Sequence, residues 1–222
     1  NLKEGDELLV GIDSHHSHLL PWQMAARVTG AKLVFLDCEM DGSYTKEAIE
    51  KVITERTKFA AITHVSNVIG RVNPVEDIIR LVHKNGGVVL VDAAQSAPHL
   101  PIDVCAMDVD FLAFSGHKLM APMGIGVLYG KEKLLDEMPP FLTGGEMIES
   151  VTRESAVFAE LPHKFEAGTV NGAGAWALKA AIEYINSLGF ATLQGRELAL
   201  TTQAMEELKK IPYVNIIGSQ DP

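Results

Sequence analysis

Three short polar segments have the residue types for chemistry, and each follows an apolar run typical of a buried strand. They are His64-Val65-Ser66-Asn67, Asp92-Ala93-Ala94-Gln95 and Ser115-Gly116-His117-Lys118. In open α/β sheets, ligands bind outside the carboxyl ends of the strands, so we expect these segments to line one cleft. A cleft that presents an amine, a carboxylate, imidazoles and hydroxyls suits an anionic ring cofactor better than a metal ion.

Pyridoxal phosphate (PLP) is a cofactor whose needs match these residue types. Its aldehyde needs a lysine amine poised for imine exchange, which Lys118 offers. Its pyridine nitrogen needs a buried carboxylate that keeps it protonated, and its phosphate needs hydroxyls, backbone N–H groups and a further donor. Its flat ring needs a partner across one face, for which an imidazole serves. The segments therefore predict a PLP site with Lys118 as the Schiff-base lysine.

The same motifs resemble a known family. The segments around Asp92 and Lys118, with Pro122 to Gly126, resemble the class V enzymes of fold-type I, and more narrowly the SufS-type cysteine desulfurases and selenocysteine lyases. Further matching stretches are His15-His16, Pro21-Trp22, Thr63 to Asn67, Pro139-Pro140, Gly144 to Ile148 and Phe165 to Thr169. Motifs in this order cover nearly the whole chain.

The resemblance implies PLP as the cofactor and gives three residues roles around its ring. Lys118 would form the Schiff base and later move the substrate proton. Asp92 would pair with the pyridine nitrogen, and Gln95 would donate to the ring hydroxyl oxygen. The substrate would be L-cysteine or L-selenocysteine, converted to L-alanine while a distant cysteine thiolate takes the sulfur.

The remaining roles concern stacking, the phosphate and a second subunit. His15 would stack on the ring and help in acid–base steps, and Asn67 would lie near the ring hydroxyl and the substrate carboxylate. Ser115 and His117 would hold the phosphate. Gly168-Thr169 would reach the phosphate of a neighbouring subunit, which implies a homodimer with shared sites. A sulfur-acceptor protein and a place in iron–sulfur cluster assembly are implied in the same way.

The sequence also departs from the family pattern. The persulfide cysteine and a carboxylate-binding arginine of such enzymes lie beyond Pro222, and a phosphate-binding turn lies before Asn1. Met120-Ala121 and Thr143 stand where the family usually has Tyr-Gly and Gly. We therefore expect residues 1–222 to be a truncated PLP-binding large domain, inactive alone, without its N-terminal segment and small C-terminal domain.

Apolar runs that alternate with amphipathic stretches must position these residues. The expected strands are Glu7–Asp13, Lys32–Leu36, Phe59–His64, Val88–Asp92, Phe111–Ser115 and Gly126–Tyr129. The expected helices are Trp22–Thr29, Thr45–Glu55, Val75–Lys84, Lys131–Met138, Ala173–Leu188 and Leu193–Ile211. The alternation predicts an α/β fold with a mostly parallel sheet sandwiched by helices, as in the fold-type I large domain. Residues 141–169 show no clear periodicity and predict an extended loop.

Composition bounds the classes of function. The formal net charge is −10, which disfavours nucleic acid as a partner because neutralising phosphates needs clustered Lys and Arg. No apolar run approaches the ~20 residues of a membrane span. Cys38 and Cys105 cannot build a disulfide framework, so we expect a cytoplasmic protein in which both are small apolar fillers.

Three alternatives stay open. Another class V aminotransferase or a kynureninase-like lyase would share the PLP residues. The chain could instead be a non-catalytic dimerisation or scaffold module. A metal-binding module would use His15, His16 and His18, but no cysteine or carboxylate stands nearby at a metal-site spacing.

Overall fold

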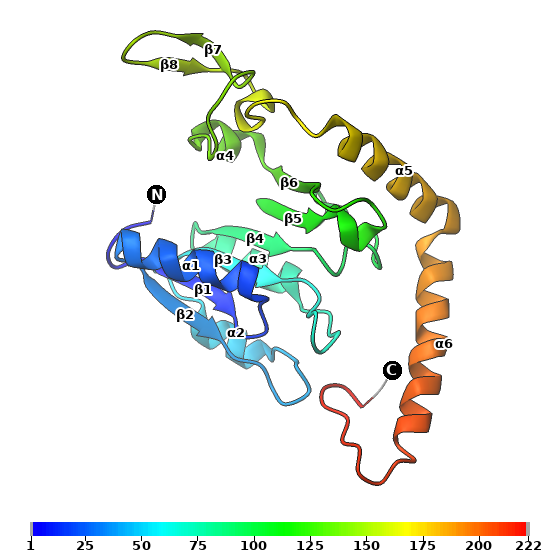
Figure 1. Ribbon diagram of the computed structural model, residues 1–222. Coiled ribbons are helices and arrows are strands. Elements are labelled where there is room, and N and C mark those ends of the chain that lie inside the picture. The colour runs from blue at the N-terminus through cyan, green and yellow to red at the C-terminus, as the bar shows by residue number, and fades with distance from the viewer. Residues whose placement is uncertain (1, 221–222) are drawn as a thin grey trace.

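A six-stranded sheet forms the centre of the molecule, in a computed structural model that describes residues 2–220 (Figure 1). Its strands are β1 (Glu7–Gly11), β2 (Lys32–Leu36), β3 (Thr57–Thr63), β4 (Val88–Asp92), β5 (Phe111–Ser115) and β6 (Gly126–Gly130). They lie in the order β2-β1-β3-β4-β5-β6, and every pair is parallel except β5 with the edge strand β6. The predicted mostly parallel α/β sheet is confirmed.

Helices cover both faces of this sheet. On one face lies α1 (His16–Thr29), and on the other lie α2 (Lys46–Val52) and α3 (Val75–Lys84). The remaining helices are α4 (Glu132–Glu137), α5 (Gly172–Leu188) and α6 (Phe190–Leu208). Side chains alternate along a strand, so Leu8 and Val10 pack beneath α1 while Leu9 joins the core beneath α2 and α3. Helices on both faces explain why the central strands are continuous apolar runs in the sequence.

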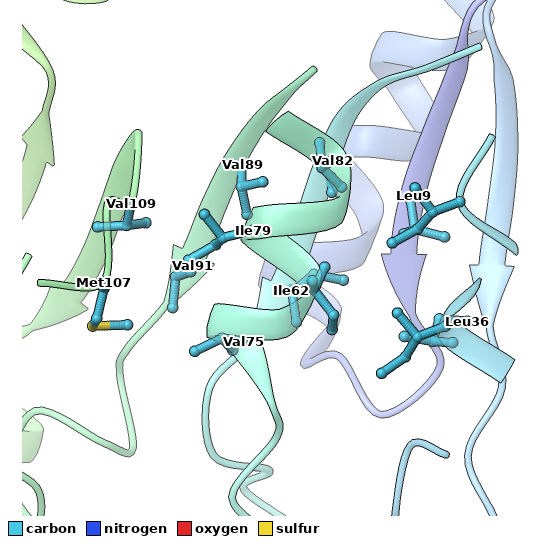
Figure 2. Close-up of a cluster of buried hydrophobic side chains, with 14 of the residues drawn as sticks. Leu9, Leu36, Ile62, Val75, Ile79, Val82, Val89, Val91, Met107 and Val109 are labelled. Carbon is cyan, nitrogen blue, oxygen red and sulfur yellow. The ribbon is translucent and has the colours of Figure 1, made fainter. Parts of the chain in front are cut away.

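The larger core lies between α3 and the middle strands. Four residues of α3 at helical spacing are buried: Val75, Ile78, Ile79 and Val82. They pack against Val89 and Val91 of β4 and Ile62 of β3, all fully buried (Figure 2). Apolar residues recur about every 3.6 positions along the helix and every 2 positions along the strands, and the two apolar faces pack together in one layer.

The first helix begins earlier than the sequence predicts. It starts at His16, not Trp22, so the predicted start is wrong. His15 caps the helix, and its Nδ1 accepts a hydrogen bond from the backbone N–H of Ser17 at 3.1 Å. Pro21 lies within the second turn, where it lacks the N–H for one helical hydrogen bond. Because a proline disfavours the interior of a helix, Pro21 favours a helix that starts just after it. The observed helix is instead capped at His15 and contains Pro21.

Residues 141–169 hold more structure than the predicted loop. The strands β7 (Ile148–Val151) and β8 (Ala156–Phe158) pair as an antiparallel hairpin that projects away from the main sheet (Figure 1). Nearly all of its side chains are exposed, so neither face carries the apolar alternation that marks a strand in sequence.

The last two helices arc around the edge of the molecule (Figure 1). Leu178 and Ile185 of α5 pack on Leu119, whereas α6 has no buried residue. One ion pair, from His99 Nδ1 to Glu197 Oε1 at 2.5 Å, ties α6 to the turn after β4. No helix in the described part of the chain has the length and apolar character needed to cross a membrane.

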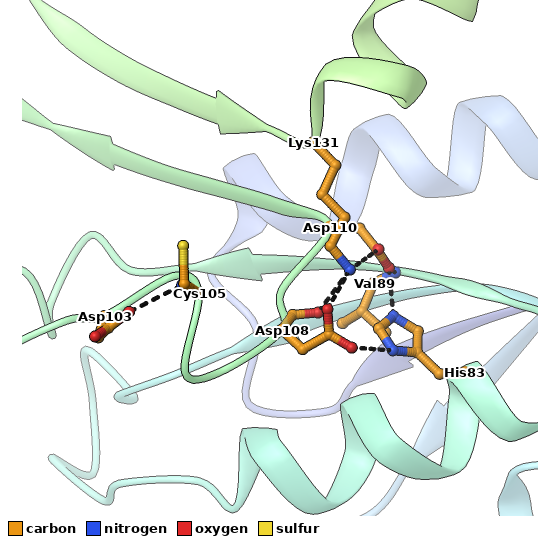
Figure 3. A network of polar contacts seen from close by, with 7 residues as sticks. All are labelled: His83, Val89, Asp103, Cys105, Asp108, Asp110 and Lys131. Atoms are coloured by element: carbon orange, nitrogen blue, oxygen red, sulfur yellow. Dashed lines mark hydrogen bonds and ion pairs between the residues drawn. The ribbon is translucent and has the colours of Figure 1, made fainter.

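An ion network joins the amino end of β5 to its neighbours (Figure 3). The buried carboxylate of Asp110 contacts His83 Nε2 at 2.7 Å and Lys131 Nζ at 2.9 Å, and accepts the backbone N–H of Val89 at 2.8 Å. The exposed Asp108 also pairs with Lys131, at 2.6 Å. Burial alone would lower the pKa of Lys131, but the bonds to both carboxylates outweigh it and raise that pKa. The network therefore links α3, β4, β5 and the end of β6.

We expect Asp110→Asn to lower the free energy of unfolding by about 2–4 kcal/mol, because it removes the buried carboxylate that pairs with both His83 and Lys131. Urea denaturation would measure the change. The matched control is Asp108→Asn, a change at an exposed carboxylate that should cost about 0–1 kcal/mol. Equal losses in the two variants would contradict the assignment of Asp110 as the centre of the network.

Candidate functional site

A cavity of about 380 Å³ opens at the carboxyl edge of the sheet, between the ends of β3, β4 and β5 and the start of α1. Seven of the nine predicted site residues line it: His15, Asn67, Asp92, Gln95, Ser115, His117 and Lys118. Its volume lies in the range of ~300–1,000 Å³ typical of small-molecule sites. The structure thus brings together side chains that are up to 103 positions apart, from His15 to Lys118.

The strand order explains where the cavity forms. From β1 the chain moves outward to β2 and then crosses to β3 on the other side of β1, and from there it continues to β4 and β5. The segments that follow β1 and β3 therefore leave in opposite directions, which opens a crevice between them. His15 follows β1 and Asn67 follows β3, so both lie at this crevice.

Asp92 is the last residue of β4 and is directed by the turn that follows. Its Oδ1 accepts the backbone N–H of Ala94 at 2.9 Å, while the N–H of Ala93 donates to the carbonyl of Ala113 in β5 at 2.8 Å. The strand pairing and the turn together fix the half-buried carboxylate in the wall of the cavity. Gln95 belongs to the same turn and also lines the cavity.

Lys118 lies in a short 3-10 helix, η1 (Gly116–Leu119), directly after β5. Gly116 leaves no room for a side chain, because a Cβ there would lie 2.6 Å from Ile125 Cγ2. Leu119 is buried against α5 and anchors the turn, so the preceding Lys118 lies in the wall of the cavity. His117 is exposed and Ser115 half-buried, and both border the same cavity.

The half-buried carboxylate of Asp13 fixes the segment that carries His15. Asp13 accepts a hydrogen bond from the Tyr44 hydroxyl and another from Asn73 Nδ2 at 2.8 Å. The same Asn73 amide donates to the carbonyl of Thr63 at 2.9 Å, which joins the ends of β1 and β3. Burial and the negative charge of Asp13 raise the pKa of Tyr44, so its hydroxyl stays a donor at physiological pH.

The structure adds His18, Ser17 and Thr63 to the cavity wall, and sequence reasoning missed all three as site residues. His18 was considered only as a metal ligand. It lies three positions after His15, which places both on one helix face, but the predicted helix began after Pro21 and hid that relation. Within residues 2–220, no group of three or more His, Cys, Asp or Glu is arranged to hold a metal ion.

Two predicted residues lie elsewhere. Gly168 and Thr169 stand between η2 (His163–Phe165) and α5, and do not line the cavity. The N–H of Gly168 donates to the carbonyl of Gly145 at 2.9 Å, and Thr169 is exposed. Their role toward a neighbouring subunit stays a prediction.

The cysteines differ from each other. Cys38 packs partly against the main core, as a filler would. Cys105 is exposed, so its prediction as an apolar filler is wrong: its turn is held by Asp103 Oδ1, which accepts the Cys105 N–H at 3.0 Å, and its thiol stays outside the core. Neither cysteine lines the cavity.

Comparison with known proteins gives a consistent assignment. The model of the family described as "Aminotransferase class-V" matches residues 1–222. The chain is 48% identical over 218 residues to a "Probable cysteine desulfurase" of Synechocystis sp., covering 98% of this chain and 52% of that protein. It is 43% identical over 222 residues to a "Cysteine desulfurase" of Shigella sonnei, covering 100% of this chain and 55% of that protein. The chain thus spans about half the length of the curated relatives it matches.

Solved structures agree with this result. The crystal structure of the cysteine desulfurase CsdA from Escherichia coli matches with a TM-score of 0.92 at 41% identity, over 96% of this chain and 53% of that one. The apo cysteine desulfurase of Thermococcus onnurineus NA1 matches with a TM-score of 0.90 at 40% identity, over 94% of this chain and 52% of that one. The cystine C-S lyase C-DES, in complex with its product cysteine persulfide, matches at 25% identity with a TM-score of 0.82, over 96% of this chain and 58% of that one.

We expect Tyr44→Phe to lower the free energy of unfolding by about 1.5–3 kcal/mol, because it removes a buried donor to the Asp13 carboxylate. Chemical denaturation would measure the loss. Tyr213→Phe is the matched control, since Tyr213 is 86% exposed and its change should stay within about 0.5 kcal/mol. A Tyr44→Phe protein as stable as the control would contradict the anchoring of this segment.

Proposed function

Because the chain belongs to the aminotransferase class-V family, we propose that it is the PLP-binding core of a cysteine desulfurase. The reaction would convert L-cysteine or L-selenocysteine to L-alanine and pass the sulfur or selenium to an enzyme thiol. The observation that carries the proposal is the convergence of Lys118, Asp92 and His15 on one cavity. Relatives named as cysteine desulfurases, 42–48% identical to the chain, support the choice of reaction.

The residues of the cavity fit PLP. An amine, a carboxylate, imidazoles, hydroxyls and an amide surround one space, and the buried Nε2 of His18 in its wall lacks a hydrogen-bond partner among the described residues. A donor set of this kind can hold an anionic ring on several sides. When bound, PLP supplies a protonated pyridine ring that withdraws electrons from the substrate.

Each residue near the ring then has a task. The Lys118 amine would hold the cofactor covalently and later take the proton from the substrate Cα. The Asp92 carboxylate, fixed by the Ala94 N–H, would keep the ring nitrogen protonated. Gln95 would donate to the ring oxygen. His15 has its Nδ1 occupied by the N–H of Ser17, which leaves Nε2 as the protonated nitrogen of a neutral ring that covers one face of the cofactor.

The phosphate and the substrate need the remaining groups. Ser115 and His117 would bind the phosphate, and Asn67 would lie near the ring oxygen and the substrate carboxylate. Gly168 and Thr169 would complete the phosphate site of a second subunit, since both lie outside the cavity of their own chain. We therefore propose a homodimer with shared sites.

Four further points belong to the proposal. Residues 1–222 would be the large PLP domain of a longer enzyme. Neither Cys38 nor Cys105 reaches the cavity, so the sulfur-accepting thiol would be a different cysteine. A sulfur-acceptor protein would then collect the sulfur, with iron–sulfur cluster assembly as its use. The protein would work in the cytoplasm.

Another class V activity is the second candidate, favoured by the structural likeness to a cystine C-S lyase. Product analysis separates the candidates. A desulfurase releases alanine from cysteine, a lyase releases pyruvate, ammonia and hydrogen sulfide, and an aminotransferase needs an amino acceptor. Alanine formation by the full-length protein would support the proposal, and the products of a lyase or of an aminotransferase would contradict it.

We expect Lys118→Ala to abolish the visible absorption band that PLP gives with the full-length protein and that borohydride fixes. Activity on cysteine should fall by at least about 10²–10⁴-fold, the usual loss for a general acid–base group. Lys46→Ala is the control, because that lysine side chain is 80% exposed on α2. A band that is retained and fixed by borohydride in Lys118→Ala would assign the Schiff base to another lysine.

Shared sites can be tested by mixing two inactive variants, Lys118→Ala and Thr169→Glu, in which the added carboxylate repels the phosphate. One site of each heterodimer would take Lys118 and Thr169 from different subunits, both unchanged. Random exchange of subunits should therefore restore about a quarter of wild-type activity. A mixture no more active than its components, with exchange shown by mass spectrometry, would refute the shared site.

A further inference from the structure

Asn73 is a buried residue to which neither the motifs nor the proposed reaction gives a role. It lies between the loop after β3 and the start of α3, and only 2% of it is exposed. Its Nδ2 donates two hydrogen bonds, to Asp13 Oδ2 at 2.8 Å and to the carbonyl of Thr63 at 2.9 Å. One amide group thus joins the segment that follows β1 to the end of β3.

Both bonds require the nitrogen of the Asn73 amide. The Asp13 carboxylate and the Thr63 carbonyl are acceptors only, so the amide oxygen could not take the place of Nδ2. That oxygen, Oδ1, is buried and has no hydrogen-bond partner among the described residues, an arrangement that costs stability. The two N–H bonds therefore fix the orientation of the side chain.

The two segments that Asn73 joins leave the sheet in different directions. The backbone pairing between β1 and β3 stops before either segment reaches the cavity. Beyond it, the N–H of Ile12 donates to the carbonyl of Leu36 in β2 at 3.0 Å. The N–H of His64 donates instead to the carbonyl of Asp92 in β4, at 2.9 Å. The Asn73 amide therefore bridges the two segments where the backbone no longer pairs them.

This residue also closes the loop that carries Asn67. The backbone N–H of Asn73 donates to the carbonyl of His64 at 2.8 Å, so the chain returns to the end of β3 after the loop. On the other side of the amide, Asp13 stands two positions before His15, which caps α1 at the cavity. Asn73 is thus connected to two of the residues that line the cavity, one on each side of the crevice.

We propose that Asn73 is a positioning residue that sets the width of the crevice between His15 and Asn67. The inference rests on the proposed function for the identity of the cofactor, since His15 would cover one face of its ring and Asn67 would lie near its oxygen. Segments released from Asn73 would take more than one position, and only a fraction of the molecules would be ready to bind. The apparent affinity falls by that fraction.

Hydrogen exchange followed by mass spectrometry measures this release directly, in full-length protein without cofactor. Asp13→Leu removes one acceptor and should speed exchange in residues 14–19 by about 10-fold or more, as expected for a lost hydrogen bond to a charged group. Asn73→Leu removes both bonds and should speed exchange in residues 66–70 as well.

The matched control for Asp13→Leu is Glu7→Leu, which removes a buried carboxylate at the amino end of the same strand. Glu7 is 4% exposed and pairs with Arg56 at 2.8 Å, so its loss should leave exchange in residues 14–19 and 66–70 unchanged. An Asp13→Leu protein with unchanged exchange in residues 14–19, or with equal acceleration throughout the chain, would overturn the proposal.

PLP binding gives a readout that a loss of stability alone would not move. Asp13→Leu should weaken PLP affinity by about 10-fold. Asp13→Asn should retain most of the affinity, because its oxygen still accepts from Asn73 and its new N–H can donate to the Tyr44 hydroxyl. In a His15→Ala background, Asp13→Leu should have little further effect, since the side chain that it helps to place is gone.

The outcomes separate this inference from the proposed function. Equal PLP affinity in wild type and Asp13→Leu, or an undiminished loss in the His15→Ala background, would show that the Asn73 bridge only stabilises the fold, and would overturn the proposal. A wild-type protein that binds no PLP would instead refute the proposed cofactor, while hydrogen exchange still tests how Asn73 holds the two segments.

Discussion

Parallel pairing of β1, β3, β4 and β5 places four carboxyl ends at one edge of the sheet, and the candidate site depends on this constraint. Each strand is covered on both faces, so it buries its apolar residues and can present polar ones only where it ends. Asp92 and Ser115 are the last residues of their strands. The crossover at β1 then opens the space into which they extend.

The carboxylates at the two edges of the sheet differ in how many partners they have. At the amino edge of β5, Asp110 is satisfied by a histidine, a lysine and a backbone N–H, as a structural ion network requires (Figure 3). At the carboxyl edge, Asp92 has one backbone donor and His18 Nε2 has none among the described residues. Unsatisfied groups lower stability, and the paired network and the apolar core beneath α3 offset that cost.

The sequence predicts much of this arrangement for physical reasons. The strands β2, β4 and β5 were predicted with the bounds that the structure shows, because each is a short apolar run, and the polar ends of β4 and β5 marked the site. The start of α1 and the hairpin of β7 and β8 could not be found this way. Pro21 suggested a helix boundary, and an exposed hairpin has no buried face to impose a period of two.

His18 shows most clearly where the sequence falls short. A histidine near a helix start has the same local signal whether it faces solvent, a metal or a cofactor, and only the register of the helix decides. Once α1 begins at His16, His18 must lie on the same face as the cap residue His15 and turn toward the end of β3 and β4. The burial of the His18 imidazole in the cavity wall follows from that register. The low helix propensity of Pro21 opposes this register of α1, and the packing of Trp22 on Phe59 stabilises it.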